Sequence, residues 1–68
     1  MRSNLTLKAE LIRKYGRLAD AADALGIPEV RLSRVIHGRV QVRDEEKRRI
    51  SWRLQMPISS LFDEEDGA

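Results

Sequence analysis

The apolar positions of the chain fall into short stretches with helical spacing. From Leu18 to Leu25 they recur every three or four residues, which predicts a helix with small apolar side chains on one face. Gly26 follows at once and suits the end of a helix, because glycine adopts a positive φ without strain. Pro28 then fits the first turn of a second helix, where its missing N–H leaves no hydrogen bond unmade.

The second helix, predicted over residues 28–37, has two different faces. Its inward face is apolar, whereas its outward face is mainly polar and basic. Two short helices joined by a tight turn that contains glycine, the second with an exposed basic face, form the helix-turn-helix pattern of DNA-binding proteins. The inward set is Leu32, Val35 and Ile36, and the outward set is Val30, Ser33, Arg34 and His37.

Another helix is predicted before this pair. It begins near Thr6, a candidate cap, runs to Tyr15 and is stopped by Gly16. Residues 1–4 are expected to be a frayed lead-in. The apolar face of this helix is predicted to consist of Leu7, Leu11, Ile12 and Tyr15.

Two more helices are predicted after the pair. Residues 44–54 begin with three acids, which suit a helix N-terminus, and contain the apolar i, i+4 pair Ile50 and Leu54. Pro57 opens a short last helix that turns Ile58, Leu61 and Phe62 towards the core. Between the two groups, residues 39–43 (RVQVR) alternate, which suits either a loop or a short strand. We favour the loop, because no partner strand or hairpin turn lies nearby.

The expected fold is therefore all-α: one compact five-helix domain over residues 1–62, followed by an acidic, disordered tail over residues 63–68 that lacks apolar anchors. The absence of cysteine excludes disulfides, thiolate catalysis and the commonest zinc sites. No apolar run approaches the roughly 18 residues of a membrane span and no signal-peptide core is present, so we expect a cytoplasmic protein.

No catalytic constellation stands out in the sequence. There is no nucleophile with a matching base and no glycine-rich phosphate loop, so we expect no enzyme activity and no cofactor or small-molecule ligand. His37 is the single histidine and has no acid at ligand spacing on its face, so we expect no metal site.

The net charge of +2 hides an uneven distribution. Residues 1–43 carry +5 and residues 44–62 carry +1, whereas residues 63–66 carry −4. A body near +6 favours a polyanionic partner. The alternative is a charged surface of mixed sign that is merely solvated.

The spacing of Ala22, Gly26, Leu32 and Val35, together with the segments LTLKAELIRKYG and VIHGR, resembles the lambda-repressor/Cro-like helix-turn-helix family, including phage Cro proteins. The resemblance covers about residues 5–62 and is closer to the all-helical branch than to the branch that ends in a β-hairpin. It implies a lambda-repressor-like fold and a transcriptional repressor that binds double-stranded DNA. Leu18 stands where the family usually has a polar residue that contacts a phosphate, and Arg17 is expected to replace it.

Residues that read bases are expected on the outward face of helix 28–37. Arg34 can donate two hydrogen bonds to a guanine edge or grip a phosphate. Val30 can either contact a thymine methyl group or pack at the edge of the motif. Glu29 can accept from a cytosine amine, although an acid in a first helical turn is favoured by the helix dipole in any case. The resemblance implies that Ser33 contacts bases or backbone. The expected phosphate contacts are Arg17, Arg31, His37, Arg39 and Arg43.

Trp52 lies about 200° around its helix from Ile50, so it is predicted to face away from the core. An exposed tryptophan often marks a contact surface. Because the last helices of related repressors carry the dimer contact, the resemblance implies a weak homodimer through Trp52 and Met56 that DNA would complete. The other interpretation is a tryptophan partly buried over Met56 or over arginine stems.

Two alternative functions remain: an antitoxin-like or other protein-interaction module, and a small structural protein.

Overall fold

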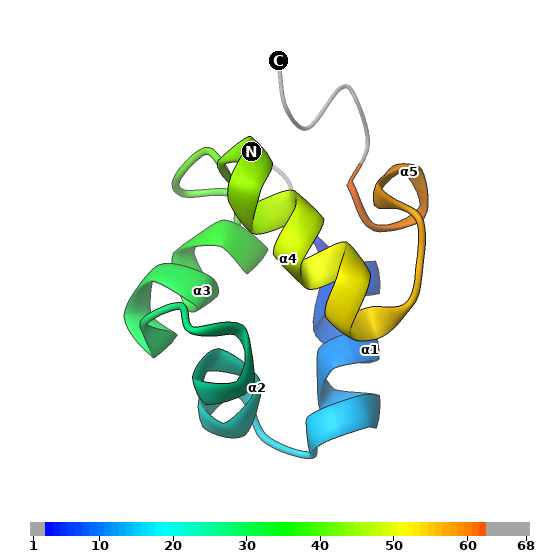
Figure 1. Ribbon diagram of the computed structural model, residues 1–68. Helices are drawn as coiled ribbons and strands as arrows, with labels where there is room; N and C mark the ends of the chain where they lie inside the picture. The colour runs from blue at the N-terminus through cyan, green and yellow to red at the C-terminus, as the bar shows by residue number, and fades with distance from the viewer. Residues whose placement is uncertain (1–2, 63–68) are drawn as a thin grey trace.

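The computed structural model describes residues 3–62, which form five α-helices and contain no strand (Figure 1). The all-α fold class is therefore confirmed, and residues 39–43 form a loop, as favoured. The predicted tail at residues 63–68 lies outside the described residues. The helices are α1 (Leu5–Tyr15), α2 (Leu18–Leu25), α3 (Glu29–Ile36), α4 (Asp44–Leu54) and α5 (Ile58–Leu61).

The first helix begins differently from the prediction. The side chain of Asn4 accepts a hydrogen bond from the Leu7 N–H at 3.0 Å, so Asn4 and not Thr6 is the N-cap of α1. Asn4 also donates from its side chain to the Leu61 carbonyl at 2.7 Å and from its backbone N–H to the Ile36 carbonyl. The expectation of a frayed lead-in is wrong for Asn4, because this residue ties the start of α1 to the ends of α3 and α5.

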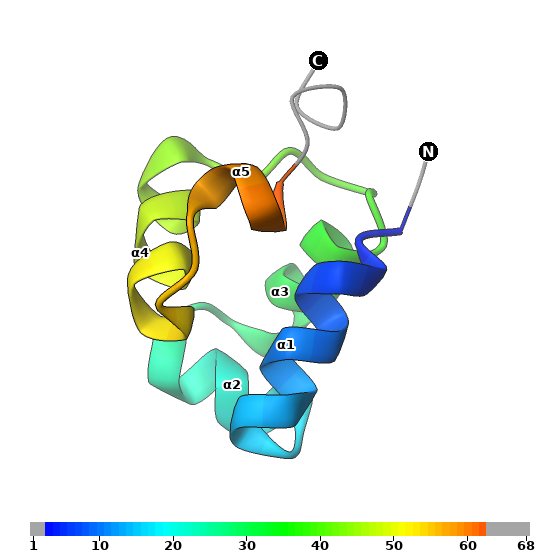
Figure 2. The same cartoon turned by 90° about the vertical axis from the view of Figure 1, so that its right-hand side faces the viewer.

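The core lies where α1, α2, α3 and α4 meet, and α5 closes it. Helix α1 packs against α2, α3 and α4 (Figures 1 and 2). Ile12 was predicted to be part of the core but is 38% exposed, because it lies at the edge of the face that Leu7 and Leu11 bury. Tyr15, Leu54 and Ile58 pack against the core while partly buried. The buried apolar residues are Leu7, Leu11, Ala21, Ala22, Leu25, Ile27, Leu32, Val35, Ile36, Ile50, Leu61 and Phe62.

A tight connection joins α2 to α3. Gly26 caps α2 in the left-handed region, with φ 68°, and the Ile27 N–H donates to the Ala22 carbonyl at 3.1 Å. The side chain of Ile27 enters the core. Pro28 is the N-cap of α3 and His37 its C-cap, so the helix is one residue shorter at each end than the predicted range 28–37.

Helix α4 has the predicted bounds and the predicted acidic first turn. Its C-cap is Gln55, whose φ of 54° lies in the left-handed region. The Lys14 ammonium group donates to the Arg53 carbonyl at 2.7 Å, which supplies a partner to the last turn of α4. The chain then turns at Pro57 into α5, and Leu61 and Phe62 are buried as predicted.

Candidate nucleic-acid interface

One face of α3 is buried and the other is open to solvent, as the sequence predicts. Leu32, Val35 and Ile36 enter the core. On the opposite face, Glu29, Val30 and Arg34 are exposed and Ser33 is half-buried. Val30 is 64% exposed although it is apolar, so packing within the described chain does not account for it. The positions predicted for base reading thus share one accessible helix face.

The loop after α3 brings more positive charge to the end of this helix. Gly38 has φ 71°, and the Arg39 N–H donates to the Arg34 carbonyl at 2.9 Å, which turns the chain back at the helix end. The side chains of Arg39 and Arg43 are exposed. Within residues 3–62, neither they nor Arg34 takes part in an ion pair. No acid in this part of the chain therefore holds these three side chains in an ion pair.

Arg17 and His37 are predicted phosphate contacts whose side chains stay exposed although each has a partner inside the chain. Arg17 precedes α2 and lies 3.5 Å from the Asp20 carboxylate, with 83% of its side chain exposed, so this pair leaves the guanidinium open to solvent. His37 is the C-cap of α3, and its Nδ1 is 2.9 Å from the Ser33 carbonyl oxygen. In Figure 1, α3 lies between α2 and the loop of residues 37–43.

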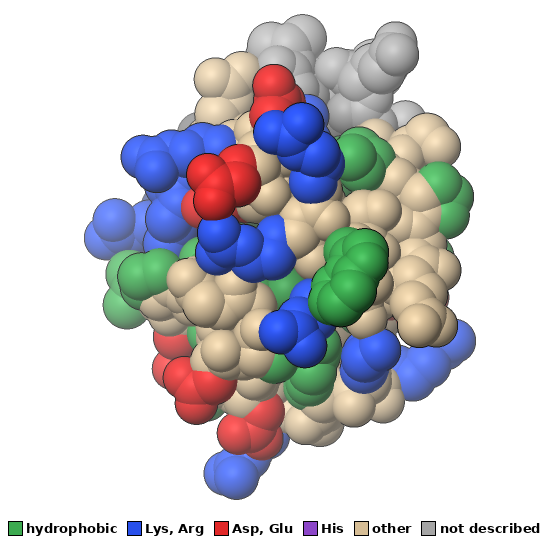
Figure 3. Space-filling model, viewed as in Figure 1, with side chains coloured by type: hydrophobic (Ala, Val, Ile, Leu, Met, Phe, Trp, Pro, Cys, Tyr) green, Lys and Arg blue, Asp and Glu red, His purple; other side chains and the backbone are tan. Residues whose placement is uncertain are grey.

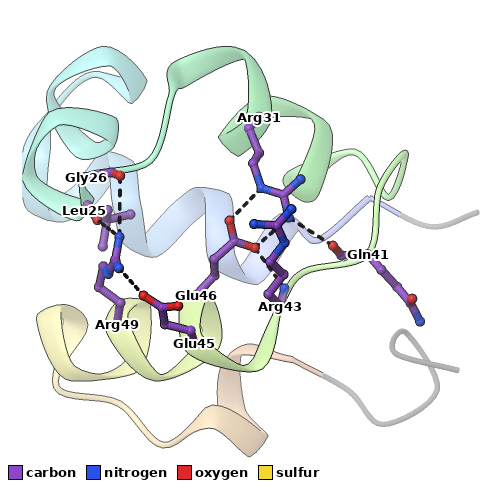
Figure 4. Close-up of polar contacts among 8 residues, drawn as sticks. All are labelled: Leu25, Gly26, Arg31, Gln41, Arg43, Glu45, Glu46 and Arg49. Carbon is purple, nitrogen blue, oxygen red and sulfur yellow. Dashed lines mark hydrogen bonds and ion pairs between the residues drawn. The ribbon is translucent and has the colours of Figure 1, made fainter.

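Arg31 is placed differently from the other candidates, because it points into the fold. Its Nε and Nη2 donate to the two carboxylate oxygens of Glu46 at 2.6 and 2.8 Å, and Nη2 is 3.4 Å from the Gln41 carbonyl oxygen (Figure 4). Glu46 also accepts from the Arg43 N–H at 2.9 Å. The pair therefore fixes the backbone of the loop that carries Arg39 and Arg43.

The electrostatic state of Glu46 follows from these contacts. Glu46 is a buried acid, only 8% exposed. The hydrogen bond from Arg31 lowers the pKa of Glu46 to about 2, and the Arg43 N–H acts in the same direction, against the desolvation that raises it. The same hydrogen bond raises the pKa of Arg31. At neutral pH the pair is fully ionised, so the charge of Arg31 is compensated within the chain.

A second arginine of α4 holds the end of α2. Nη1 of Arg49 donates to the Leu25 carbonyl at 3.0 Å and lies 3.5 Å from the Gly26 carbonyl oxygen, while Nη2 pairs with Glu45 at 2.6 Å (Figure 4). A cation at these carbonyls complements the negative end of the α2 dipole. Helix α4 therefore supports both α2 and α3: Arg49 binds the end of α2, and Glu46 binds Arg31 in the first turn of α3.

Sequence reasoning did not identify Glu46 and Arg49 as supports of the candidate interface. Their positions on α4 predict exposed charges in or near an acidic first turn. The i, i+4 spacing of Glu45 and Arg49 is the one available signal, and it indicates only a pair within one helix. The partners Arg31 and Leu25 are 15 and 24 residues away in the sequence.

The predicted dimer residues lie at the other end of α4. Trp52 is 76% exposed, and the guanidinium carbon of Arg53 lies 5.6 Å from its ring centroid. Met56 is partly buried against the core. The outward orientation of Trp52 is as predicted, whereas burial over Met56 is not observed.

Within residues 3–62, no group of His, Cys, Asp and Glu side chains is arranged to hold a metal ion. No helix in this part of the chain is long and apolar enough to cross a membrane.

Comparison of the chain with protein-family models, curated proteins and solved structures gives no match.

Proposed function

We propose that the protein is a sequence-specific regulator of transcription, most like a Cro-type repressor, that binds double-stranded DNA with α2 and α3 as a helix-turn-helix. The observation that carries the proposal is the exposed face of α3, where Arg34 has no acidic partner within residues 3–62 and Val30 has no apolar cover. The resemblance of residues 5–62 to the lambda-repressor/Cro-like family supports it. Such a regulator acts in the cytoplasm and needs no cofactor.

The dimensions of α3 suit the proposed role. An α-helix with its side chains is about 10–12 Å wide, which fits a major groove about 12 Å across. The eight residues of α3 expose Val30 and Arg34 on adjacent turns, so a thymine methyl group and a guanine edge can be met from one helix face. Glu29 and Ser33 complete the proposed reading set.

Phosphate contacts are assigned to Arg17, Arg39 and Arg43, with His37 at the end of α3. Arg31 was expected to contact a phosphate, but its bidentate pair with Glu46 favours a supporting role. In this role it fixes the loop that presents Arg39 and Arg43 to the DNA backbone. Backbone contacts of this kind orient a protein on the duplex, whereas base contacts supply sequence preference.

Replacement of Arg34 by alanine tests the proposal. Arg34→Ala is expected to weaken binding to the preferred duplex by about 1–3 kcal/mol and to relax the preference at one base pair. Arg13→Ala is the matched control, because Arg13 is an exposed arginine outside α2, α3 and the loop that follows α3. Fluorescence anisotropy with labelled duplexes measures both variants. An unchanged sequence preference in Arg34→Ala would contradict the proposed reading face.

The expected homodimer through Trp52 and Met56 stays a prediction. A two-fold contact sets the same surface patch of each copy against itself. Arg53 and Lys14 border Trp52, so such a contact brings like charges together, which opposes association. The proposal therefore does not depend on a dimer in solution, since two copies can also assemble on adjacent half-sites of DNA.

A further inference from the structure

An open groove lies beside Trp52, at the end of α4. Its volume is about 690 Å³, within the range of ligand-binding clefts. The end of α1 forms one wall with Lys14 and Tyr15, and the end of α4 with the turn after it forms the other with Trp52, Arg53 and Met56. Figure 3 shows apolar and basic side chains side by side over this part of α4. In Figure 1, α3 lies on the opposite side of the molecule.

The groove combines an apolar surface with positive charge. Trp52 presents a large ring that is 76% exposed, next to Met56 and Pro57. Its lining includes two cations, Lys14 and Arg53, and no acid. Within residues 3–62, neither cation takes part in an ion pair. A matching ligand therefore has an apolar side chain close to one or more carboxylates.

The cations are held in place by contacts within the groove. The Lys14 ammonium group donates to the Arg53 carbonyl, and the Arg53 guanidinium lies over the Trp52 ring. Lysine has three donors, so Lys14 keeps further donors for a ligand. A guanidinium held in one plane suits the two oxygens of a carboxylate. Because these contacts already restrict the two side chains, Lys14 and Arg53 lose less conformational freedom on ligand binding than unrestrained side chains would.

From this chemistry we infer that the groove binds an acidic segment of a partner protein. An apolar side chain of the segment packs against Trp52 and Met56, and an adjacent carboxylate pairs with Arg53 and Lys14. A second copy of the chain is disfavoured, because a two-fold contact at this patch opposes like charges. Single-stranded nucleic acid is also disfavoured on the ring face over which the Arg53 guanidinium lies, because a base stacked there would have to displace it.

This docking site does not depend on DNA binding. It is formed by α1, α4 and the turn that follows α4, whereas the proposed reading face belongs to α3. Both surfaces can therefore be occupied together. The partner would then be carried to the DNA site that α3 selects, or held apart from DNA if the proposed function is wrong.

Selection of peptides from a random displayed library, with the full chain as bait, tests the inference. We expect enriched peptides that place Asp or Glu next to an aromatic or aliphatic residue. The best peptide is then synthesised and titrated while fluorescence is followed, which reports on the groove directly because Trp52 is the single tryptophan. Burial of the ring by the peptide is expected to shift the emission to the blue.

Variants separate charge recognition from general effects. Arg53→Glu is expected to weaken peptide binding at least tenfold, and Arg53→Lys by a smaller factor, because lysine keeps the charge but loses the planar pair of donors. Lys8→Glu is the control, because it makes the same change of charge at an exposed site on α1 outside the groove lining. It is expected to leave binding within twofold. Neither side chain is buried, so all three variants are expected to remain folded, and circular dichroism checks this.

Four results would each overturn the inference. The first is no enrichment, or enrichment of peptides without acids. The second is equal loss of binding in Arg53→Glu and Lys8→Glu. The third is a blue shift that depends on protein concentration without peptide, which would assign the groove to a second copy. The fourth is tighter binding of a ten-nucleotide oligothymidine than of the selected peptide, which would assign it to single-stranded nucleic acid.

Discussion

Glu46→Gln perturbs the one ion pair that links α3 to α4 within residues 3–62, a pair in which the acid is buried and the arginine partly exposed. Glutamine keeps the size of the side chain but removes the charge that Arg31 and the Arg43 N–H require. One hydrogen bond from Arg31 can still reach the amide oxygen, while the amide nitrogen opposes a second donor. We therefore expect Glu46→Gln to destabilise the fold at neutral pH.

The size of the effect follows from the pKa of Glu46. A decrease of this pKa from its ordinary value of 4.5 to about 2 in the folded chain corresponds to about 3 kcal/mol of stability above pH 4.5. The Arg31 side chain is 26% exposed, so water screens part of the interaction, and glutamine retains part of the hydrogen bonding. We expect a loss of about 1–2 kcal/mol in the free energy of unfolding at pH 7.

The pH dependence identifies the mechanism. Because the pKa of Glu46 is lowered on folding, its contribution is complete above the unfolded pKa of about 4.5 and is lost as the pH falls towards 2. Other carboxylates titrate in both proteins, so the difference between wild type and variant isolates Glu46. That difference is expected to be constant from pH 7 to pH 5 and to lose more than half of its size by about pH 3.

Urea unfolding followed by circular dichroism measures the free energy at each pH. Glu45→Gln is the control, because Glu45 forms an exposed i, i+4 pair with Arg49, and its loss is expected to cost about 0.5 kcal/mol or less. A difference between wild type and Glu46→Gln that is absent at pH 7, or that persists unchanged at pH 3, would refute the reasoning.

Two other predictions concern DNA binding and the end of α4. Arg39→Ala is expected to weaken binding to all duplexes about equally and to reduce the slope of log affinity against log salt concentration by about one. Fluorescence anisotropy from about 50 to 200 mM salt measures both effects, and a selective loss of affinity for one sequence would contradict the phosphate role of Arg39. Gln55→Gly is expected to raise the free energy of unfolding by about 0.5–1 kcal/mol, because glycine adopts the φ of 54° without strain. In the same urea experiment, Gln55→Ala should give no such gain, because alanine is strained at this φ.

The helices themselves could be predicted from the sequence, because their signals are local. Gly26 and Pro28 mark the turn between α2 and α3, and Leu32, Val35 and Ile36 show which face of α3 is buried. The choice of Thr6 instead of Asn4 as the first cap was wrong, because both residue types cap helices and only the tertiary contacts of Asn4 distinguish them.

The supports of the candidate interface could not be predicted, because they depend on how distant helices pack. Arg31 is one of several arginines in or near α3, and nothing local shows that it turns towards Glu46. Arg49 binds carbonyl groups of α2, which carry no sequence signal of their own. Ile12 was assigned to the core from its spacing, but the helix buries a narrower stripe than the sequence suggests.

Selection of bound duplexes from a random pool, at low salt and with the full chain, tests the central claim most directly. The account predicts enrichment of a short consensus that contains a guanine recognised by Arg34 and a neighbouring thymine recognised by Val30, and loss of the guanine preference in Arg34→Ala. Enrichment of two inverted half-sites would add that two copies bind together. A pool that stays random after repeated rounds, while the protein is folded, would contradict the claim that α3 reads DNA.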